Sequence, residues 1–123
     1  MNITMGVREI KFRLWDNLHN KMIYDNEFVA CYVCELLTDG AASNPNSYPM
    51  QYTGLKDVNK KEVYENDIIV INGKKYQVVW GWGIYEFVSM GKHDSLFVYD
   101  VAVNGDVMGE VIGNIYENPE LLR

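Results

Sequence analysis

The chain has 123 residues, the size of a single domain, and 48% of them are hydrophobic and 13% aromatic. This composition supplies a sizeable core and excludes disorder of the whole chain, and the aromatic content favours β-sheet. The formal net charge is −6, and residues 61–123 account for most of it, with five basic against ten acidic side chains. A nucleic-acid binder normally carries a basic stripe, so the charge argues against DNA or RNA as a partner.

Several other classes of protein are also excluded. No run of about 18 apolar residues is present, so no membrane span is expected. The first nine residues lack the layout of a secretory signal, and two cysteines do not make a disulfide framework. We therefore expect a cytoplasmic protein.

The chain divides into four predicted regions. Residues 1–6 form a short N-terminal extension, and residues 7–37 form an N-terminal β region. Residues 38–50 contain two prolines among small polar residues, which is typical of a flexible loop or linker. Residues 51–123 form a second β region.

The N-terminal region is predicted to hold a hairpin and a further strand. Residues 8–16 alternate with period two, which places Ile10, Phe12 and Leu14 on a buried face and Glu9, Lys11 and Arg13 on a polar face. Turn residues follow, and residues 22–24 return as the second strand. Residues 28–37 are apolar almost throughout, which favours a buried strand but is also compatible with a short helix.

The second region is predicted to be a series of short strands. Residues 67–71 lead into Asn72 and Gly73, a strong hairpin signal, and residues 74–80 return with Tyr76, Val78 and Trp80 on one face. A turn at residues 81–83 and strands at 84–90, 96–103 and 107–115 follow. Residues 118–122 predict one terminal helical turn. The expected fold is mainly β, with the N-terminal β region packed on a C-terminal SH3-like small barrel.

Three phrases of the sequence resemble the YopX family of phages and prophages. Members typically open with REIKFRAWD, and residues 8–16 read REIKFRLWD. A central phrase, QYTGLKDKNGKEIYEGDIV, resembles residues 51–69, and VIGNIYENPELL matches residues 111–122. The resemblance implies a β-rich phage or prophage protein of unknown function with an SH3-type barrel, and it carries over no catalytic residue.

The chain departs from the central phrase at two positions where the family usually has glycine. Asn66 tolerates the left-handed backbone conformation and is expected to keep the turn. Lys60 tolerates it less well, so we expect residues 57–61 to use a different turn. If the phrase is structural, both residues lie in turns and no ligand pocket surrounds them.

The candidates for chemistry have simpler structural explanations. Cys31 and Cys34 form a lone C-x-x-C, but on a strand their side chains would point to opposite faces, so we interpret them as small buried hydrophobic residues. His19 and His93 lie in predicted turns with no nucleophile beside them. We therefore expect no catalytic residues, no metal site and no cofactor.

An acidic cluster and an aromatic turn complete the set of candidates. Glu62, Glu65 and Asp67 could serve a small metal-dependent hydrolase, which is the least favoured function. If Trp80 faces the core, Trp82 beside Tyr85 offers an exposed anchor for a protein partner, although Trp82 could instead fold back over the barrel end. The weaker contact candidates are Tyr52 and Leu55.

The predicted function is a non-catalytic protein-interaction module with an unknown protein partner, and self-association into a homo-oligomer is compatible with it. The alternative is an accessory factor that binds or mimics nucleic acid. Direct binding would require Arg8, Lys11, Arg13, Lys74 and Lys75 to gather on one face, whereas mimicry would not.

Overall fold

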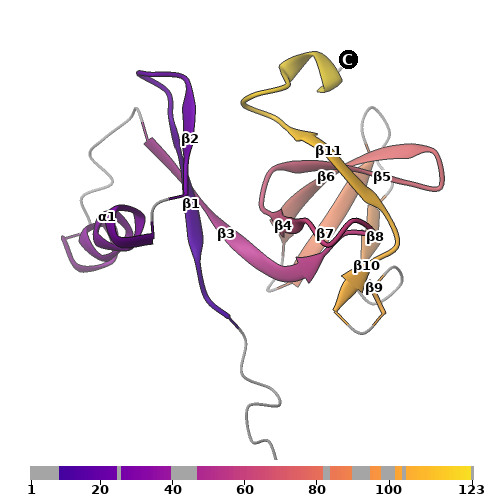
Figure 1. Cartoon of the computed structure of the whole chain (residues 1–123), viewed down its shortest axis with the longest axis horizontal. Helices are drawn as coiled ribbons and strands as arrows, with labels where there is room; N and C mark the ends of the chain where they lie inside the picture. The colour runs from indigo at the N-terminus through magenta and orange to yellow at the C-terminus, as the bar shows by residue number, and fades with distance from the viewer. Residues whose placement is uncertain are drawn as a thin grey trace, which may run out of the picture.

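The structure is a computed structural model that describes residues 9–24, 26–39, 47–81, 84–89, 95–97, 102–103 and 105–122. Within these residues the protein is mainly β, as predicted, and its strands form two sheets. The first sheet has the order β2-β1-β3-β10-β9, with β4 also paired to β3, and the second has the order β11-β5-β6-β7-β8. Helix α1 lies beside β1, on the side away from the second sheet (Figure 1).

The predicted N-terminal hairpin is confirmed. Strand β1 (Phe12–Asp16) pairs antiparallel with β2 (Lys21–Ile23). Asp16 closes the turn, because its Oδ1 accepts hydrogen bonds from the backbone N–H of Leu18 at 3.0 Å and of His19 at 3.2 Å. Asn20 takes a left-handed φ of 53°. Local turn chemistry therefore builds this hairpin, as the polar residues indicated.

The strand predicted over residues 28–37 is wrong, since this segment lies in helix α1 (Asn26–Asp39). Its apolar run is compatible with both the strand and the helix periodicity, so tertiary packing decided which of the two forms. Val29, the only buried side chain described in the helix, and Val33 are four residues apart and so share one helix face. Glu27 in the first turn also suits the positive end of the helix dipole.

Strand β1 is covered on both faces, which corrects the prediction of one polar face. Arg13 is only 3% exposed, because the second β region packs over its side of the strand. Ile10, which was predicted to be buried, is 69% exposed. Phe12 on that same side is half-buried close to α1.

Strand β3 (Ser47–Lys56) links the two parts of the fold (Figure 1). Its first half pairs with β1, and its second half pairs with β4 (Glu62–Tyr64) and β10 (Asp106–Val107). Its start, Ser47 to Met50, was predicted to belong to the flexible loop and is instead strand, with Met50 buried. Residues 38–39 of that loop belong to α1, and residues 40–46 lie outside the described part of the chain.

A bulge divides the two halves of β3. Gly54 has a φ of 87°, and the register against β4 shifts between Tyr52 and Lys56. The hydroxyl of Thr53 donates to the carbonyl oxygen of Val63 at 2.7 Å and accepts from the N–H of Leu55 at 3.1 Å. Such a bulge bends the strand and increases its twist, which suits one strand that serves both parts of the fold.

The Asn-Gly hairpin of the second sheet is confirmed. Strand β5 (Asp67–Ile71) turns through Asn72 and Gly73, with φ values of 51° and 79°, into β6 (Lys74–Gly81). Strands β7 (Ile84–Ser89) and β8 (Ser95–Phe97) continue the sheet on one side, and β11 (Glu110–Asn114) pairs with β5 on the other. A short 3-10 helix over Pro119–Leu122 confirms the predicted terminal turn.

Two long strands predicted near the C-terminus are each divided between the sheets. The first sheet takes β9 (Ala102–Val103) from residues 96–103, whereas β8 joins the second sheet. Residues 107–115 are likewise shared by β10 and β11, with Gly109 between them. A Cβ atom at Gly109 would lie 2.7 Å from the carbonyl oxygen of Val70, so this crossing requires glycine.

The two sheets share one hydrophobic core and do not close into a barrel within the described residues. The SH3-like detail of the prediction is therefore still an interpretation, while the small, mainly β fold is established. The core consists of Val63, Ile69, Ile71, Tyr76, Val78, Tyr85, Phe87, Val107 and Val111. Trp80 was predicted to share a face with Tyr76 and Val78, but it is 53% exposed whereas those two residues are buried, so the condition that Trp80 faces the core is not met. Among the described residues, no helix has the length and apolar character needed to span a membrane.

Candidate functional site

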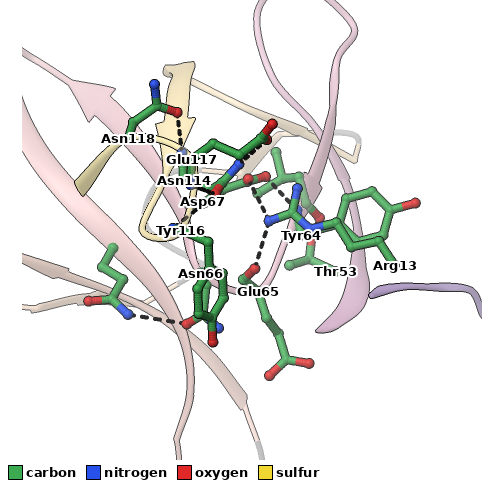
Figure 2. Close-up of polar contacts among 12 residues, drawn as sticks. Arg13, Thr53, Tyr64, Glu65, Asn66, Asp67, Asn114, Tyr116, Glu117 and Asn118 are labelled. Atoms are coloured by element: carbon green, nitrogen blue, oxygen red, sulfur yellow. Dashed lines mark hydrogen bonds and ion pairs between the residues drawn. The ribbon is translucent and has the colours of Figure 1, made fainter. Parts of the chain in front are cut away.

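The acidic cluster of the central phrase contacts other parts of the protein, and Asp67 is the most buried of its three members. Its Oδ1 lies 2.9 Å from Nη2 of Arg13, and both side chains are at least nine-tenths buried. The same Nη2 donates to the carbonyl oxygen of Glu65 at 3.0 Å, and the N–H of Tyr64 donates to Oδ2 of Asp67 at 2.8 Å. The guanidinium carbon lies 4.7 Å from the centre of the Tyr64 ring. Figure 2 shows these groups in contact, so the Asp67 side chain connects β5 to β1.

Burial shifts the pKa values of Asp67 and Tyr64. Desolvation raises the pKa of Asp67 above its usual value, and the charge of Arg13 and the Tyr64 amide oppose that shift. Burial likewise raises the pKa of Tyr64 to about 12. The Tyr64 phenol therefore stays protonated at neutral pH, which does not suit a nucleophile or a general base.

The two other acids of the cluster have separate partners. Oε1 of Glu65 accepts a hydrogen bond from the N–H of Gln51 at 2.6 Å, and Glu62 forms an ion pair with Lys11. Glu62 is the main reason that the pKa of Lys11 lies well above its usual value. In the described part of the chain, no three His, Cys, Asp or Glu side chains are placed to hold a metal ion.

Asp57 is an equally structural acid that the sequence analysis did not single out. Its carboxylate is buried and accepts from three backbone N–H groups: Asn59 at 2.8 Å, Lys61 at 2.9 Å and Val111 at 2.9 Å. It therefore closes a turn and ties that turn to β11. An aspartate at the start of a polar turn is a signal for this role, because its side chain bonds readily to nearby backbone amides.

His19 and the two cysteines are exposed in the described part of the chain. Nδ1 of His19 lies 2.7 Å from Oδ2 of Asp16 at the exposed tip of the hairpin, and this contact lowers the pKa of Asp16. His93 lies outside the described residues. Cys31 and Cys34 are exposed, not buried as predicted, and they lie on helix α1 rather than on a strand.

None of the three predicted contact residues that the structure describes is exposed. Tyr52 and Tyr85 are buried, Leu55 is half-buried, and Trp82 lies outside the described residues. Trp80 is exposed, and its ring meets that of Tyr85 edge-on with centroids 4.7 Å apart. Contact with a partner through these residues remains a prediction.

Of the basic side chains proposed for nucleic-acid binding, Lys11, Arg13 and Lys75 each have a partner within the protein. Arg13 is buried against Asp67, and Lys11 is paired with Glu62 and Glu9. Lys75 donates to the carbonyl oxygen of Leu121 at 3.1 Å, in the other half of the fold. Arg8 lies outside the described residues.

A groove of about 490 Å³ lies between the start of β1 and helix α1. Apolar side chains from both elements line it, with Glu9 and Lys11 at the strand: Ile10, Phe12, Val29, Ala30, Val33 and Cys34 complete the lining. The groove exists because α1 covers only part of the apolar face of β1. The sequence analysis missed it, since it assigned residues 28–37 to a strand.

Comparison with protein-family models shows to which family this chain belongs. The model of the YopX protein family matches residues 11–123. The chain belongs to the YopX family. Comparison with curated proteins gives no match.

Two solved structures have a similar fold. A crystal structure of protein EF1440 from Enterococcus faecalis aligns with a TM-score of 0.62 at 21% identity, covering 94% of this chain and 99% of that one. An X-ray structure of YopX from Bacillus subtilis aligns with a TM-score of 0.56 at 19% identity, covering 92% and 98%. At these identities the likeness extends to the fold alone.

The two departures from the YopX central phrase both adopt the glycine-like backbone. Lys60 has a φ of 65° and Asn66 a φ of 67°, and both lie in turns. The expectation of a different turn at residues 57–61 is therefore wrong. Asp57 holds this turn so firmly that Lys60 accepts the strained conformation. Asn66 receives a hydrogen bond from Gln77 at 3.2 Å and donates its N–H to Val78 at 2.8 Å, so its turn is anchored on β6.

The closing YopX phrase is also structural. Asn114 accepts from the N–H groups of Tyr116 and Glu117 at 3.0 and 2.8 Å (Figure 2), which forms a tight turn after β11. The Tyr116 ring then stacks on Trp15 and on Tyr48, with centroid distances of 5.5 and 5.6 Å. The phrase therefore joins the C-terminal end to the N-terminal hairpin.

Proposed function

We propose that this YopX-family chain is a non-catalytic protein-interaction module of phage or prophage origin that acts in the bacterial cytoplasm. The contact surface is helix α1 together with the groove that it forms with the start of β1. The partner is a protein, and the chain needs no cofactor.

One observation carries this proposal: among the side chains of α1 whose burial the structure describes, residues 27–34, several apolar ones are exposed. Its sequence, NEFVACYVCELLTD, contains three acidic residues and no basic one. Val29 is buried, whereas Phe28 is 56% exposed and Ala30 and Cys31 are exposed as well. A helix that is hydrophobic all round is normally buried, and a contiguous exposed apolar surface is typical of an interaction site.

The placement of the acidic side chains supports a non-catalytic role. The three acidic residues considered for a hydrolase each contact another part of the protein. Asp67 pairs with Arg13, Glu65 accepts a hydrogen bond from the backbone of Gln51, and Glu62 pairs with Lys11. Because three of the basic candidates have partners within the protein, a protein partner is favoured over nucleic acid.

Site-specific photo-crosslinking in cells tests the proposal. A crosslinking amino acid at Ala30, which is exposed and lines the groove, is expected to capture a discrete partner. The matched control is Glu110, which is exposed on β11 far from α1 (Figure 1). The adduct at position 30 should disappear when Ile10→Asp places a charge in the groove.

Two results would contradict the proposal. Equal adducts at positions 30 and 110 would show non-specific capture, and persistence of the adduct in the Ile10→Asp variant would place the contact elsewhere. Because Ile10 is 69% exposed, this variant should keep its fold, which thermal unfolding checks.

A further inference from the structure

We infer that Cys31 and Cys34 of α1 form a dithiolate site for a soft metal ion that accepts two sulfur ligands in line, the coordination typical of Cu(I). The inference concerns the thiols of the helix itself and does not rest on the proposed protein partner. It goes beyond the proposed function, because the protein contact does not require the ion and the ion does not require the partner.

The helix places the two thiols side by side. The interpretation of these cysteines as small buried residues assumed a strand, on which positions i and i+3 point to opposite faces. Both residues lie instead in α1, where side chains three positions apart share one face. Both are exposed, and α1 lies on the side of β1 away from the second sheet (Figure 1). An ion can therefore reach both sulfur atoms from solvent.

The spacing of side chains on a helix suits a bridging metal better than a disulfide. Side chains three positions apart have Cβ atoms about 5–6 Å apart, whereas a disulfide requires a Cβ separation of about 3.5–4.5 Å. A metal–sulfur bond is about 2.3 Å long, so an ion held in line between two sulfur atoms spans about 4.6 Å. Rotation about χ1 of the two cysteines can set their sulfur atoms at that separation while the helix stays intact.

The set of ligands favours an ion that is satisfied by two thiolates. Zinc sites take four protein ligands when they are structural and three when they are catalytic. In the part of the chain that the structure describes, no three His, Cys, Asp or Glu side chains are placed to hold a metal ion. The chain contains only these two cysteines. Thiolates select soft ions, and Cu(I) is the soft ion that two of them can hold.

Binding of the ion releases protons. Thiolates are the ligands, so each cysteine gives its proton to solvent as its sulfur atom binds. One monovalent cation and two thiolates leave a single negative charge, which stays in contact with water because both side chains are exposed. The affinity for Cu(I) should therefore increase as the pH rises from about 6 to about 8.

Titration of the fully reduced chain with Cu(I) under anaerobic conditions tests the inference. A chromogenic Cu(I) chelator competes for the ion, and its absorbance reports how much of the ion the protein takes up. We expect one ion per chain, and X-ray absorption should show two sulfur ligands. Cys31→Ser and Cys34→Ser should each weaken binding by more than about a hundredfold, since loss of even an outer-shell partner costs a metal site about 10–100-fold.

A matched control keeps the number of thiols and changes only their placement. The double variant Cys34→Ser with Glu110→Cys has two exposed thiols per chain, but one of them lies on β11, far from α1 (Figure 1). It should bind Cu(I) as weakly as Cys34→Ser alone. Because the substituted positions are exposed, all of these variants should keep the fold, which thermal unfolding checks.

Three results would overturn the inference. Undiminished binding in either serine variant, or recovery of binding in Cys34→Ser with Glu110→Cys, would show that the pair on the helix does not chelate the ion. One ion per two chains, together with a dimer in light scattering, would place the site between two copies. Ready formation of a Cys31–Cys34 disulfide with oxidised glutathione, at unchanged helix content by circular dichroism, would contradict the spacing that favours a metal.

Discussion

Arg13 and Asp67 form an ion pair that is buried between β1 and β5, with Nη2 and Oδ1 2.9 Å apart, although 54 residues separate them in the chain. The two residues come from the opening and the central YopX phrases. Their contact gives both phrases a structural role in one fold. It also makes the pair the most direct test of how the N-terminal hairpin is held.

We predict that Asp67→Asn lowers the free energy of unfolding by about 3–5 kcal/mol, because it leaves the Arg13 charge buried without an anion. The double variant Arg13→Met with Asp67→Asn should recover at least half of that loss, since it removes the stranded charge. Urea unfolding measures both variants. Asp106→Asn is the control, because it breaks the exposed pair with Lys60 and should cost less than about 1 kcal/mol. Equal losses for Asp67→Asn and Asp106→Asn would show that the buried pair has no special role.

Asp57→Asn is expected to destabilise the protein by about 2–3 kcal/mol, because an amide has only one oxygen for the three backbone donors that now share the carboxylate. Its NH₂ group would face the N–H of Val111 or those of Asn59 and Lys61. Chemical denaturation with hydrogen exchange at Val111 measures the effect. Asn59→Ala keeps the backbone donor at an exposed position and should change stability by no more than about 0.5 kcal/mol. An Asp57→Asn variant of unchanged stability would rule out this role of the carboxylate.

The left-handed backbone conformation of Lys60 predicts that glycine is favoured over alanine at this position. Because Lys60 holds a φ of 65°, Lys60→Gly should be more stable than Lys60→Ala by about 1 kcal/mol. Both variants lose the ion pair with Asp106, so their difference isolates the backbone strain. Thermal unfolding of the two variants measures it. If the alanine variant is as stable as the glycine variant, the left-handed turn at this position is not strained.

Tyr64 makes stability depend on pH in the alkaline range. Burial raises the pKa of Tyr64 to about 12, whereas an unfolded chain ionises the phenol near pH 10. Between these two pH values the folded state binds the proton more tightly, so the stabilisation that is complete below about pH 10 is lost as the pH rises towards about 12.

Ultraviolet titration should show that Tyr64→Phe removes one late-titrating phenol, and that the alkaline loss of stability becomes shallower. Burial also raises the pKa of Tyr52 and Tyr116, so other late-titrating phenols should remain. The exposed Tyr24 provides the control, since Tyr24→Phe should leave every late phenol in place. An unchanged late titration in Tyr64→Phe would contradict the burial of this ring.

Predictions from the sequence succeeded where the signal was local and failed where a distant element decided the outcome. Asn72 and Gly73 predicted their hairpin, because both residues accept the positive φ that the turn requires. The assignment of residues 28–37 failed, since an almost continuous apolar run has no single periodicity. That error concealed the groove, and with it the exposure of Cys31 and Cys34.

The sequence by itself determined the mainly β class, the two confirmed hairpins and the membership of the YopX family, because turn chemistry and family phrases can be recognised over a few neighbouring residues. Only the tertiary structure decided what the charged side chains do. Arg13 follows an alternating pattern that indicates a solvent-facing residue, yet it is buried because β5 brings Asp67 against it. Several side chains of the central phrase hold the backbone in place. The surface proposed for function lies instead on α1, where packing against β1 decides which side chains are buried.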